Sequence, residues 1–215
     1  MLNSAAQRAN MVATQVRTND VTDARVCRAL LEVPREDFVP EALASLAYME
    51  SCVPLARGRV LLDPRSFAKM LQLAAIGEDD SVLDVGCTTG YSTAVLARLA
   101  ARVVGLEQDL DLAELAAENL RGLTGVEVAN DPFDMGCPER SPFNVIVVNG
   151  AVERRPDVLL EQLADDGRLV CVVREGAAGH AYLFVKHDGA IGERSAFDAQ
   201  LPVLPGFEKI LNFVF

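Results

Sequence analysis

The part of the chain from Ser81 onward alternates short apolar runs with segments of helical composition, and this alternation restricts the possible folds more than any other feature. The apolar runs cover residues 82–85, 103–106, 126–128, 145–148 and 169–173. The helical segments between them cover residues 91–101, 110–120 and 156–164. Strands that alternate with helices favour right-handed crossovers and a mostly parallel sheet with helices on both faces. The sequence therefore predicts an α/β fold.

The N-terminal segment, residues 1–79, reads differently because its apolar positions recur at helical spacing. Residues 11–16 predict a first helix, Thr22 is a candidate cap for a second, and a third is expected from Pro64 onward. We therefore expect a helical segment packed on a core of residues 80–215.

The end of the chain also departs from the alternating pattern. Residues 181–186 and 210–215 have strand composition, and proline and glycine punctuate the stretch between them. Two such strands could form an antiparallel end to the sheet.

Charge and cysteine content exclude several classes of protein. The chain has 20 Lys and Arg against 31 Asp and Glu, a formal net charge of −11, which argues against a protein that follows nucleic-acid phosphates. Five cysteines without a Cys-x-x-Cys pair, and only two histidines, favour reduced thiols and predict no metal site. The first 16 residues do not resemble a signal peptide, and no run of about 18 apolar residues could span a membrane. We expect a cytoplasmic protein that binds neither nucleic acid nor membranes.

Residues 82–92 predict a ligand site at the carboxyl edge of the sheet. A buried strand ends in Asp84, a turn with Gly86 and Gly90 follows, and a helix then begins. Such a turn presents backbone N–H groups and the positive end of a helix dipole to a ligand. The next strand ends in Glu107, 21 positions beyond Gly86, where an acid can accept hydrogen bonds from ribose hydroxyls.

The pattern does not fit a dinucleotide. The G-x-G-x-x-G fingerprint requires glycine where Thr88 and Tyr91 stand, and the Asp84 carboxylate would repel a pyrophosphate. An acid at this place suits a ligand that carries an amine. S-adenosylmethionine has an amine on its methionine moiety, together with ribose hydroxyls for Glu107. The alternative is that Asp84 only caps the turn.

Further candidate contacts lie at the same edge of the sheet. Asp131 follows the third strand and could accept a hydrogen bond from an adenine amino group, whereas Asn149 and Gly150 end the fourth strand. The segment Asn130-Asp131-Pro132-Phe133 is superficially similar to the Asn-Pro-Pro-aromatic box of amino-methylating enzymes. That box belongs after the fourth strand, so we interpret the likeness as accidental. Cys87 lies in the glycine turn and is interpreted as a small packing residue rather than a nucleophile.

Several segments resemble the protein-L-isoaspartate O-methyltransferase family. They are Met11-Val12 with Gln15-Val16, Val33-Pro34-Arg35-Glu36 with Phe38-Val39-Pro40, the turn from Asp84 to Tyr91, Asp131, and residues 163–169. The likeness runs from about Met11 to about Val173, and the Val-Pro-Arg-Glu-x-Phe-Val-Pro segment is its most specific part.

The resemblance implies a Rossmann-like class I methyltransferase fold with an N-terminal helical extension. It also implies that S-adenosylmethionine donates a methyl group to an isoaspartyl carboxylate in a damaged protein or peptide, and it is compatible with a monomer or a weak homodimer. By match of motif, the cofactor contacts are Asp84, Gly86, Gly90, Glu107 and Asp131. Cys87, Asn149 and Gly150 complete the expected site from their places in the turn and at the fourth strand.

The chain departs from the family pattern at two places. Thr88 stands where the family turn usually has glycine, and at positive φ its side chain would cost roughly 1–2 kcal/mol. The family loop Thr-Ile-Ser-Ala-Pro-His aligns with residues 60–65, so Leu62 replaces the serine that handles the substrate and Arg65 replaces the histidine. Leu62 cannot orient an oxygen by hydrogen bonding. Arg65 is our candidate catalytic residue because it could grip a carboxylate with two hydrogen bonds; alternatively it is a solvated arginine at a helix start.

Three hypotheses about function remain open from the sequence. The first is isoaspartyl methylation. The second is methyl transfer to another acceptor, with the altered loop reshaping the acceptor pocket. The third is a non-catalytic protein of the same fold that binds S-adenosylmethionine or a protein partner.

Overall fold

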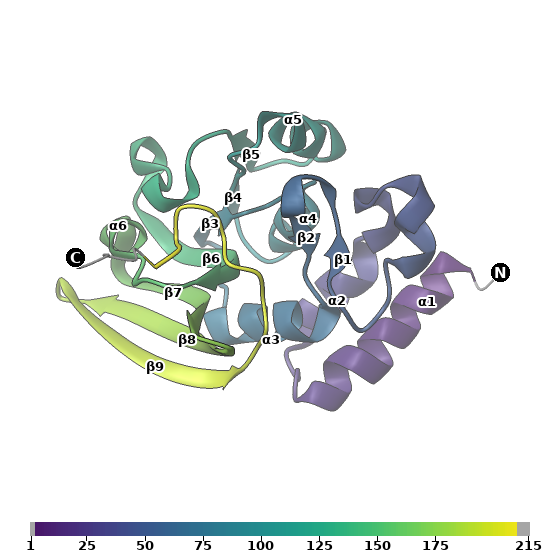
Figure 1. The fold of residues 1–215 in the computed structure, drawn as a ribbon, viewed down its shortest axis with the longest axis horizontal. Helices are drawn as coiled ribbons and strands as arrows, with labels where there is room; N and C mark the ends of the chain where they lie inside the picture. The colour runs from purple at the N-terminus through teal and green to yellow at the C-terminus, as the bar shows by residue number, and fades with distance from the viewer. Residues whose placement is uncertain (1–2, 210–215) are drawn as a thin grey trace, which may run out of the picture.

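The computed structural model describes residues 3–209 and has a seven-stranded sheet at its centre (Figure 1). The strand order is β5-β4-β3-β6-β7-β8-β9. The parallel strands are β3 (Ser81–Val85), β4 (Arg102–Leu106), β5 (Val126–Ala129), β6 (Phe143–Val152) and β7 (Leu163–Glu175). The antiparallel strands are β8 (Ala178–His187) and β9 (Ala190–Asp198). The predicted α/β fold with a mostly parallel sheet is confirmed.

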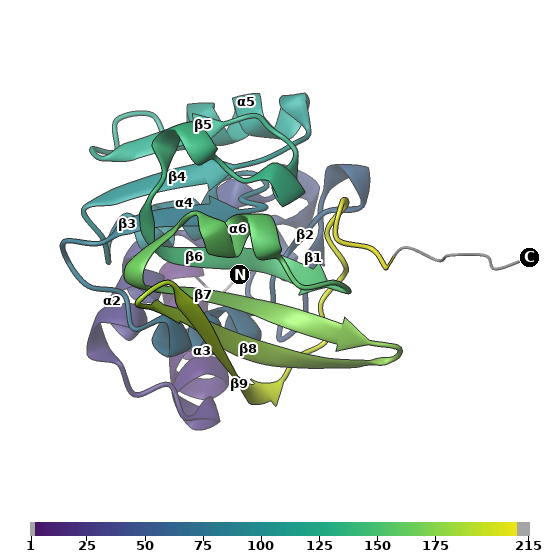
Figure 2. The ribbon, with the colours of Figure 1, turned by 90° about the vertical axis from the view of Figure 1, so that its left-hand side faces the viewer.

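Helices cover both faces of this sheet. They are α1 (Ser4–Met11), α2 (Ala24–Glu32), α3 (Pro64–Ala74), α4 (Tyr91–Leu96), α5 (Leu110–Asn119) and α6 (Asp157–Glu161). A π-helical stretch, Val12–Val16, continues α1, and a two-residue hairpin of β1 (Val53–Pro54) and β2 (Val60–Leu61) precedes α3. Figure 2 shows α6 on the near face of the sheet and the N-terminal helices on the far one.

Carboxylate caps fix where the helices begin. The Asp23 side chain accepts hydrogen bonds from the Arg25 and Val26 backbone N–H groups at 2.7 and 3.2 Å, so Asp23 rather than Thr22 caps α2. Asp63 caps α3 in the same way by accepting from the Ser66 N–H at 2.8 Å. Asp63 directly follows Leu62, so this cap fixes the start of α3 beside the altered loop.

The side chains of each strand alternate between two hydrophobic clusters, one on each face of the sheet. Val82 and Val103 pack with buried residues of α1, α2, α3 and α4, whereas Leu83 and Val104 pack with α6 on the opposite face. The first cluster contains residues from both sides of position 80. The N-terminal segment therefore packs directly on the sheet.

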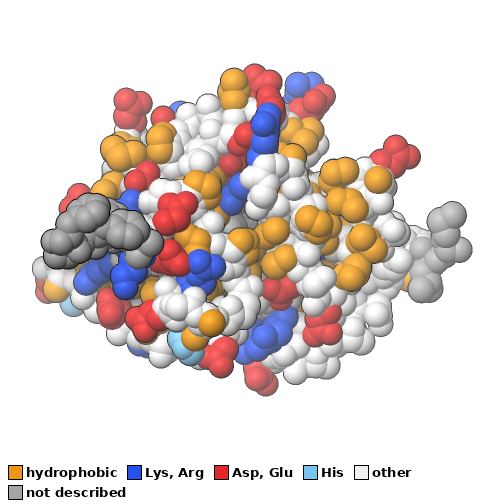
Figure 3. All heavy atoms as spheres, viewed as in Figure 1, with side chains coloured by type: hydrophobic (Ala, Val, Ile, Leu, Met, Phe, Trp, Pro, Cys, Tyr) orange, Lys and Arg blue, Asp and Glu red, His pale blue; other side chains and the backbone are white. Residues whose placement is uncertain are grey.

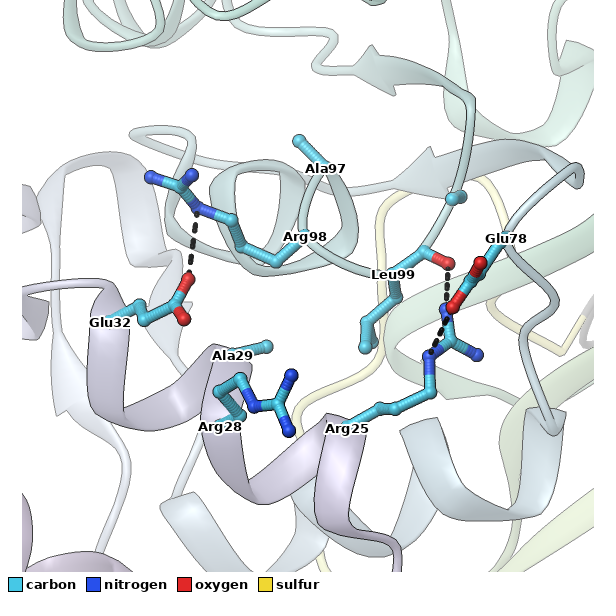
Figure 4. Close-up of a pocket in the computed structure, with 9 residues that line it drawn as sticks. Arg25, Arg28, Ala29, Glu32, Glu78, Ala97, Arg98 and Leu99 are labelled. Atoms are coloured by element: carbon cyan, nitrogen blue, oxygen red, sulfur yellow. Dashed lines mark hydrogen bonds and ion pairs between the residues drawn. The ribbon is translucent and has the colours of Figure 1, made fainter.

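A cleft of about 320 Å³ lies between α2 and the end of α4 (Figure 4). The Arg25 guanidinium donates to the Ile76 and Leu99 carbonyl oxygens at 2.7 and 2.6 Å, and Arg98 pairs with Glu32 at 3.8 Å. These contacts attach α2 to the segments that lead into β3 and β4. The cleft is at the amino ends of these strands, opposite the carboxyl edge where ligands of such sheets bind.

The antiparallel end of the sheet differs from its prediction in one strand. Residues 181–186 lie in β8, as predicted, but its partner is β9, formed by residues 190–198, which were expected to be irregular. Asp188 and Gly189 have φ values of 48° and 75° and form the tight turn between these strands. The other predicted strand, residues 210–215, lies outside the described residues.

No helix within residues 3–209 combines the length and the apolar character that crossing a bilayer requires.

Candidate functional site

The turn after β3 has the backbone conformation that the sequence predicts for a ligand site. Gly86 and Gly90 have φ values of 81° and 97°, which glycine adopts without strain, and Gly90 is the N-terminal cap of α4. The Gly86 and Cys87 N–H groups donate to the Leu106 carbonyl at 2.8 and 3.1 Å. The turn is thus held against the end of β4, beside Glu107.

Thr88 occupies a left-handed conformation in this turn, with φ at 54°. A β-branched residue there is strained by roughly 1–2 kcal/mol. The Thr88 N–H donates to Glu107 Oε2 at 3.0 Å, and this charge-assisted bond offsets part of the strain. Thr88 therefore has the positive φ for which the sequence predicts a conformational cost.

Glu107 is completely buried, and its carboxylate is already engaged within the protein. Oε1 accepts from the Asp109 N–H at 3.3 Å, and Oε2 accepts from Arg59 Nη2 at 3.4 Å as well as from Thr88. Asn130 Nδ2 donates to the Glu107 backbone carbonyl at 2.8 Å. The loop after β5 is thereby attached to the predicted ribose acid.

Asp84 is also completely buried, and three side chains donate to it. Ser92 and Thr93 donate to Oδ2 at 2.7 and 2.6 Å, and Asn149 Nδ2 donates to Oδ1. Burial raises the pKa of Asp84 to about 6, although the three hydrogen bonds favour the ionised form. The Asp84 carboxylate is therefore enclosed by the side chains of Ser92, Thr93 and Asn149.

Asp84→Asn should change how stability depends on pH. Because the pKa of Asp84 is raised from 3.8 to about 6 on folding, the folded state binds more protons than the unfolded state between these values. The contribution of Asp84 to the free energy of unfolding of the wild type therefore falls as the pH rises through that window, by roughly 2–3 kcal/mol in total. Urea unfolding of both proteins from pH 4 to 7 should show that the free energy of unfolding of the variant increases relative to that of the wild type by this amount. A difference that is constant with pH would contradict the raised pKa.

Asn149, rather than Asp84, has a free hydrogen-bond acceptor for the amine of a ligand. Its Nδ2 faces the Asp84 carboxylate, which can only accept, so its Oδ1 must point the other way. Oδ1 is buried and has no hydrogen-bond partner among residues 3–209. It belongs to a residue that lines the small cavity beside Gly86 and Thr88. A buried, unpaired carbonyl oxygen at this place suits the amine of a ligand.

The remaining predicted cofactor contacts differ in their surroundings. Cys87 is buried, and burial raises the pKa of its thiol well above the usual value, as expected for a packing residue. Asp131 is exposed, next to the Asn130 side chain that binds the Glu107 carbonyl. Gly150 lies beneath Leu204, whose Cδ2 would be 2.6 Å from a β-carbon on this glycine.

The altered loop places Leu62 at the site. Leu62 is buried and lines the same small cavity as Thr88 and Asn149. Its carbonyl accepts a hydrogen bond from the completely buried Arg35, which also donates to the Ala47 carbonyl at 2.5 Å. The most specific segment of the sequence thus holds the loop in place through Arg35.

Arg65 lies elsewhere. It is half-buried and lines a cleft of about 630 Å³ together with Glu50, Asp63 and Asp198. Within residues 3–209 this cleft shares no lining residue with the cavity beside the glycine turn. The structure therefore brings Asp84, Glu107, Asn149 and Leu62 together and leaves Arg65 in a neighbouring cleft.

Sequence reasoning missed Arg59 and Leu204, which lie on the glycine turn. A β-carbon on Gly86 would be 2.7 Å from Arg59 Nη2 and 3.3 Å from Leu204 Cδ1. The only signal in the sequence is a charged residue directly before the apolar run 60–62. The polar groups of the site fit S-adenosylmethionine, and these two side chains lie directly against the turn that would hold it.

Among residues 3–209, no three side chains of His, Cys, Asp or Glu lie close enough together to hold a metal ion.

Comparisons with known proteins match this chain over most of its length. A family profile described as protein-L-isoaspartate(D-aspartate) O-methyltransferase matches residues 6–199. A protein-L-isoaspartate O-methyltransferase of Methanoculleus marisnigri is 36% identical over 187 residues, 86% of this chain and 85% of the relative. One of Anaeromyxobacter sp. is 39% identical over 181 residues, 83% of this chain and 74% of the relative.

Solved structures show the same fold. A Plasmodium falciparum protein described as a protein-L-isoaspartate O-methyltransferase, solved with S-adenosyl-L-homocysteine, matches with a TM-score of 0.80 at 21% identity, over 95% of this chain and 99% of that one. Another protein-L-isoaspartate O-methyltransferase matches with a TM-score of 0.81 at 24% identity, over 93% of this chain and 66% of that one.

Proposed function

This chain belongs to the protein-L-isoaspartate O-methyltransferase family, and from that membership we propose that it methylates an isoaspartyl carboxylate of damaged proteins with S-adenosylmethionine as the methyl donor. The observation that carries the proposal is a set of buried polar atoms at the carboxyl edge of the sheet. There, the Glu107 carboxylate and the unpaired Asn149 Oδ1 flank the glycine turn.

Each of these groups matches one part of the cofactor. The Glu107 carboxylate would accept hydrogen bonds from the ribose hydroxyls, and Asn149 Oδ1 would accept one from the methionine amine. Asp131, next to the loop residue that binds Glu107, would face the adenine amino group. The bound cofactor supplies an activated methyl group to the acceptor.

The acceptor carboxylate is itself a nucleophile, so the chain has to orient and desolvate it rather than remove a proton from it. Leu62 gives the cavity an apolar wall that excludes water but donates no hydrogen bond. We propose that Arg65 binds a carboxylate of the substrate from the neighbouring cleft. In the cavity itself, Leu62 therefore provides no hydrogen bond that orients the isoaspartyl carboxylate.

Calorimetric titration and a methylation assay test the proposal together. We expect the wild-type chain to bind S-adenosylmethionine and S-adenosylhomocysteine, and to transfer a labelled methyl group to an isoaspartyl peptide but not to the matched aspartyl peptide. Binding without isoaspartyl methylation would favour a different acceptor. Binding of neither molecule would favour the non-catalytic alternative.

We also propose that the protein acts in the cytoplasm on protein substrates, as a monomer or weak homodimer, and binds neither nucleic acid nor membranes. All five cysteines are free thiols, which suits a reducing compartment. On the face shown in Figure 3, Lys and Arg side chains lie among Asp and Glu rather than in a continuous basic patch.

A further inference from the structure

We propose that Arg59 competes with the cofactor for Glu107: its guanidinium binds the Glu107 carboxylate until the ribose hydroxyls of the cofactor displace it. Leu204 closes the same space from the other side of the glycine turn. This inference rests on the proposed function, since it concerns how the same site takes up S-adenosylmethionine.

The first support is the position of the Arg59 side chain, which reaches across the predicted adenosine site. Nη2 donates to Glu107 Oε2 at 3.4 Å, and Cζ lies 4.8 Å from the ring centre of Phe133 in the loop after β5. The same nitrogen is 2.7 Å from where a β-carbon on Gly86 would stand. Arg59 therefore contacts the ribose acid, the glycine turn and the loop after β5 at once.

The second support is that Arg59 is poorly satisfied where it lies. Its side chain is 7% exposed, and its Nε has no hydrogen-bond partner among residues 3–209. Its ion pair with Glu107, at 3.4 Å, is longer than the one hydrogen bond, at 3.0 Å, that the Thr88 N–H donates to the same carboxylate. A buried guanidinium with an unpaired N–H is held weakly, because the desolvation of the charge is only partly offset. Ribose hydroxyls can therefore replace it on Glu107.

The third support is Leu204, which closes the site from the C-terminal strap, defined as residues 199–207. The strap crosses the carboxyl edge of the sheet (Figures 1 and 2). It is held to β6 by two backbone hydrogen bonds with Ala151, from the Ala151 N–H to the Pro202 carbonyl at 2.8 Å and from the Leu204 N–H to the Ala151 carbonyl at 2.9 Å. Leu204 is completely buried against Gly86 and Gly150.

The cavity beside the glycine turn, which Gly86, Thr88 and Asn149 line, holds only about 10 Å³. That volume holds about one water molecule, whereas sites for ligands of drug size enclose roughly 300–1,000 Å³. Arg59 already contacts the Glu107 carboxylate, and both Arg59 and Leu204 lie against Gly86, so cofactor binding at this turn requires Arg59 to leave Glu107 and Leu204 to shift. The apparent affinity is reduced by the fraction of molecules that are closed.

The test is calorimetric titration of S-adenosylhomocysteine into the wild type, Arg59→Gln and a matched control, Arg57→Gln. Arg57 is an exposed arginine of the same hairpin that pairs with Asp109 and Asp111 on the surface. Glutamine is neutral and shorter than arginine, so it competes less for Glu107 but can still donate a hydrogen bond. We expect Arg59→Gln to bind at least tenfold more tightly than the wild type and Arg57→Gln to bind as the wild type does.

Leu204→Ala is the second variant, and thermal unfolding without ligand checks that every variant is folded. We expect Leu204→Ala to bind more tightly than the wild type as well. If the wild type binds and both site variants bind equally or more weakly, the competition is refuted and the proposed function stands. If Arg59→Gln and the wild type both fail to bind, the competition is refuted and the cofactor part of the proposed function fails with it.

Discussion

Glu107→Gln should weaken the binding of S-adenosylmethionine by about tenfold or more when it is introduced into the Arg59→Gln chain. Glu107 is completely buried at the end of β4, and its carboxylate faces the glycine turn. Hydrogen bonds to a charged acceptor contribute about 1.5–3 kcal/mol, against about 0.5–1.5 kcal/mol for a neutral one. Tenfold corresponds to about 1.4 kcal/mol, so the loss of charge alone accounts for the expected change. Calorimetric titration of the double variant against Arg59→Gln measures it.

The Arg59→Gln background is needed because, in the wild type, the same substitution also releases Arg59 from Glu107. The two effects oppose each other and would obscure the result. Alanine is a poorer replacement than glutamine, since it leaves both the Thr88 and the Asp109 N–H groups without an acceptor, whereas the glutamine amide oxygen still accepts from one of them. Equal affinity in a folded double variant would exclude Glu107 from the ribose site.

The fold could be predicted because local pattern and tertiary structure agree in most of the chain. The run 82–85 becomes β3, with Leu83 and Val85 on one face and Val82 on the other. Strand β9 was missed because most of its residues are exposed at the edge of the sheet and show no apolar alternation. Its signal was the Asp188-Gly189 pair, which favours a tight hairpin turn.

The sequence predicts which residues lie together where this depends on position along the strands, and it does not predict contacts between distant segments. Asp84 and Glu107 lie at neighbouring strand ends, so the sheet brings them to one edge. Arg59 comes from the β1–β2 hairpin and Leu204 from the C-terminal strap, and neither segment has a spacing that predicts contact with Gly86. Only the assembled structure shows that these side chains lie against the glycine turn.

Leu62→Ser should raise the rate of isoaspartyl methylation roughly tenfold or more at saturating cofactor. Leu62 lines the cavity with Thr88 and Asn149, and Arg35 fixes its backbone through the carbonyl oxygen, so a serine hydroxyl there would lie beside the acceptor. Orienting a reacting group raises the rate without strengthening cofactor binding. Methylation of matched isoaspartyl and aspartyl peptides with a labelled donor, together with titration of S-adenosylhomocysteine, measures both quantities.

Leu62→Ala is the matched control, because it removes the same buried side chain without adding a hydroxyl. Both replacements cost stability, since loss of a buried leucine costs about 2–5 kcal/mol, so the two variants are compared below their unfolding temperatures. A rate gain in Leu62→Ala equal to that in Leu62→Ser would mean that space, not hydrogen bonding, limits the reaction.

Arg65→Ala tests the contribution of Arg65: if Arg65 binds the substrate carboxylate from its own cleft, this variant loses the activity of the wild type. Brisk isoaspartyl methylation by the wild type that survives Arg65→Ala would show that neither residue governs the acceptor.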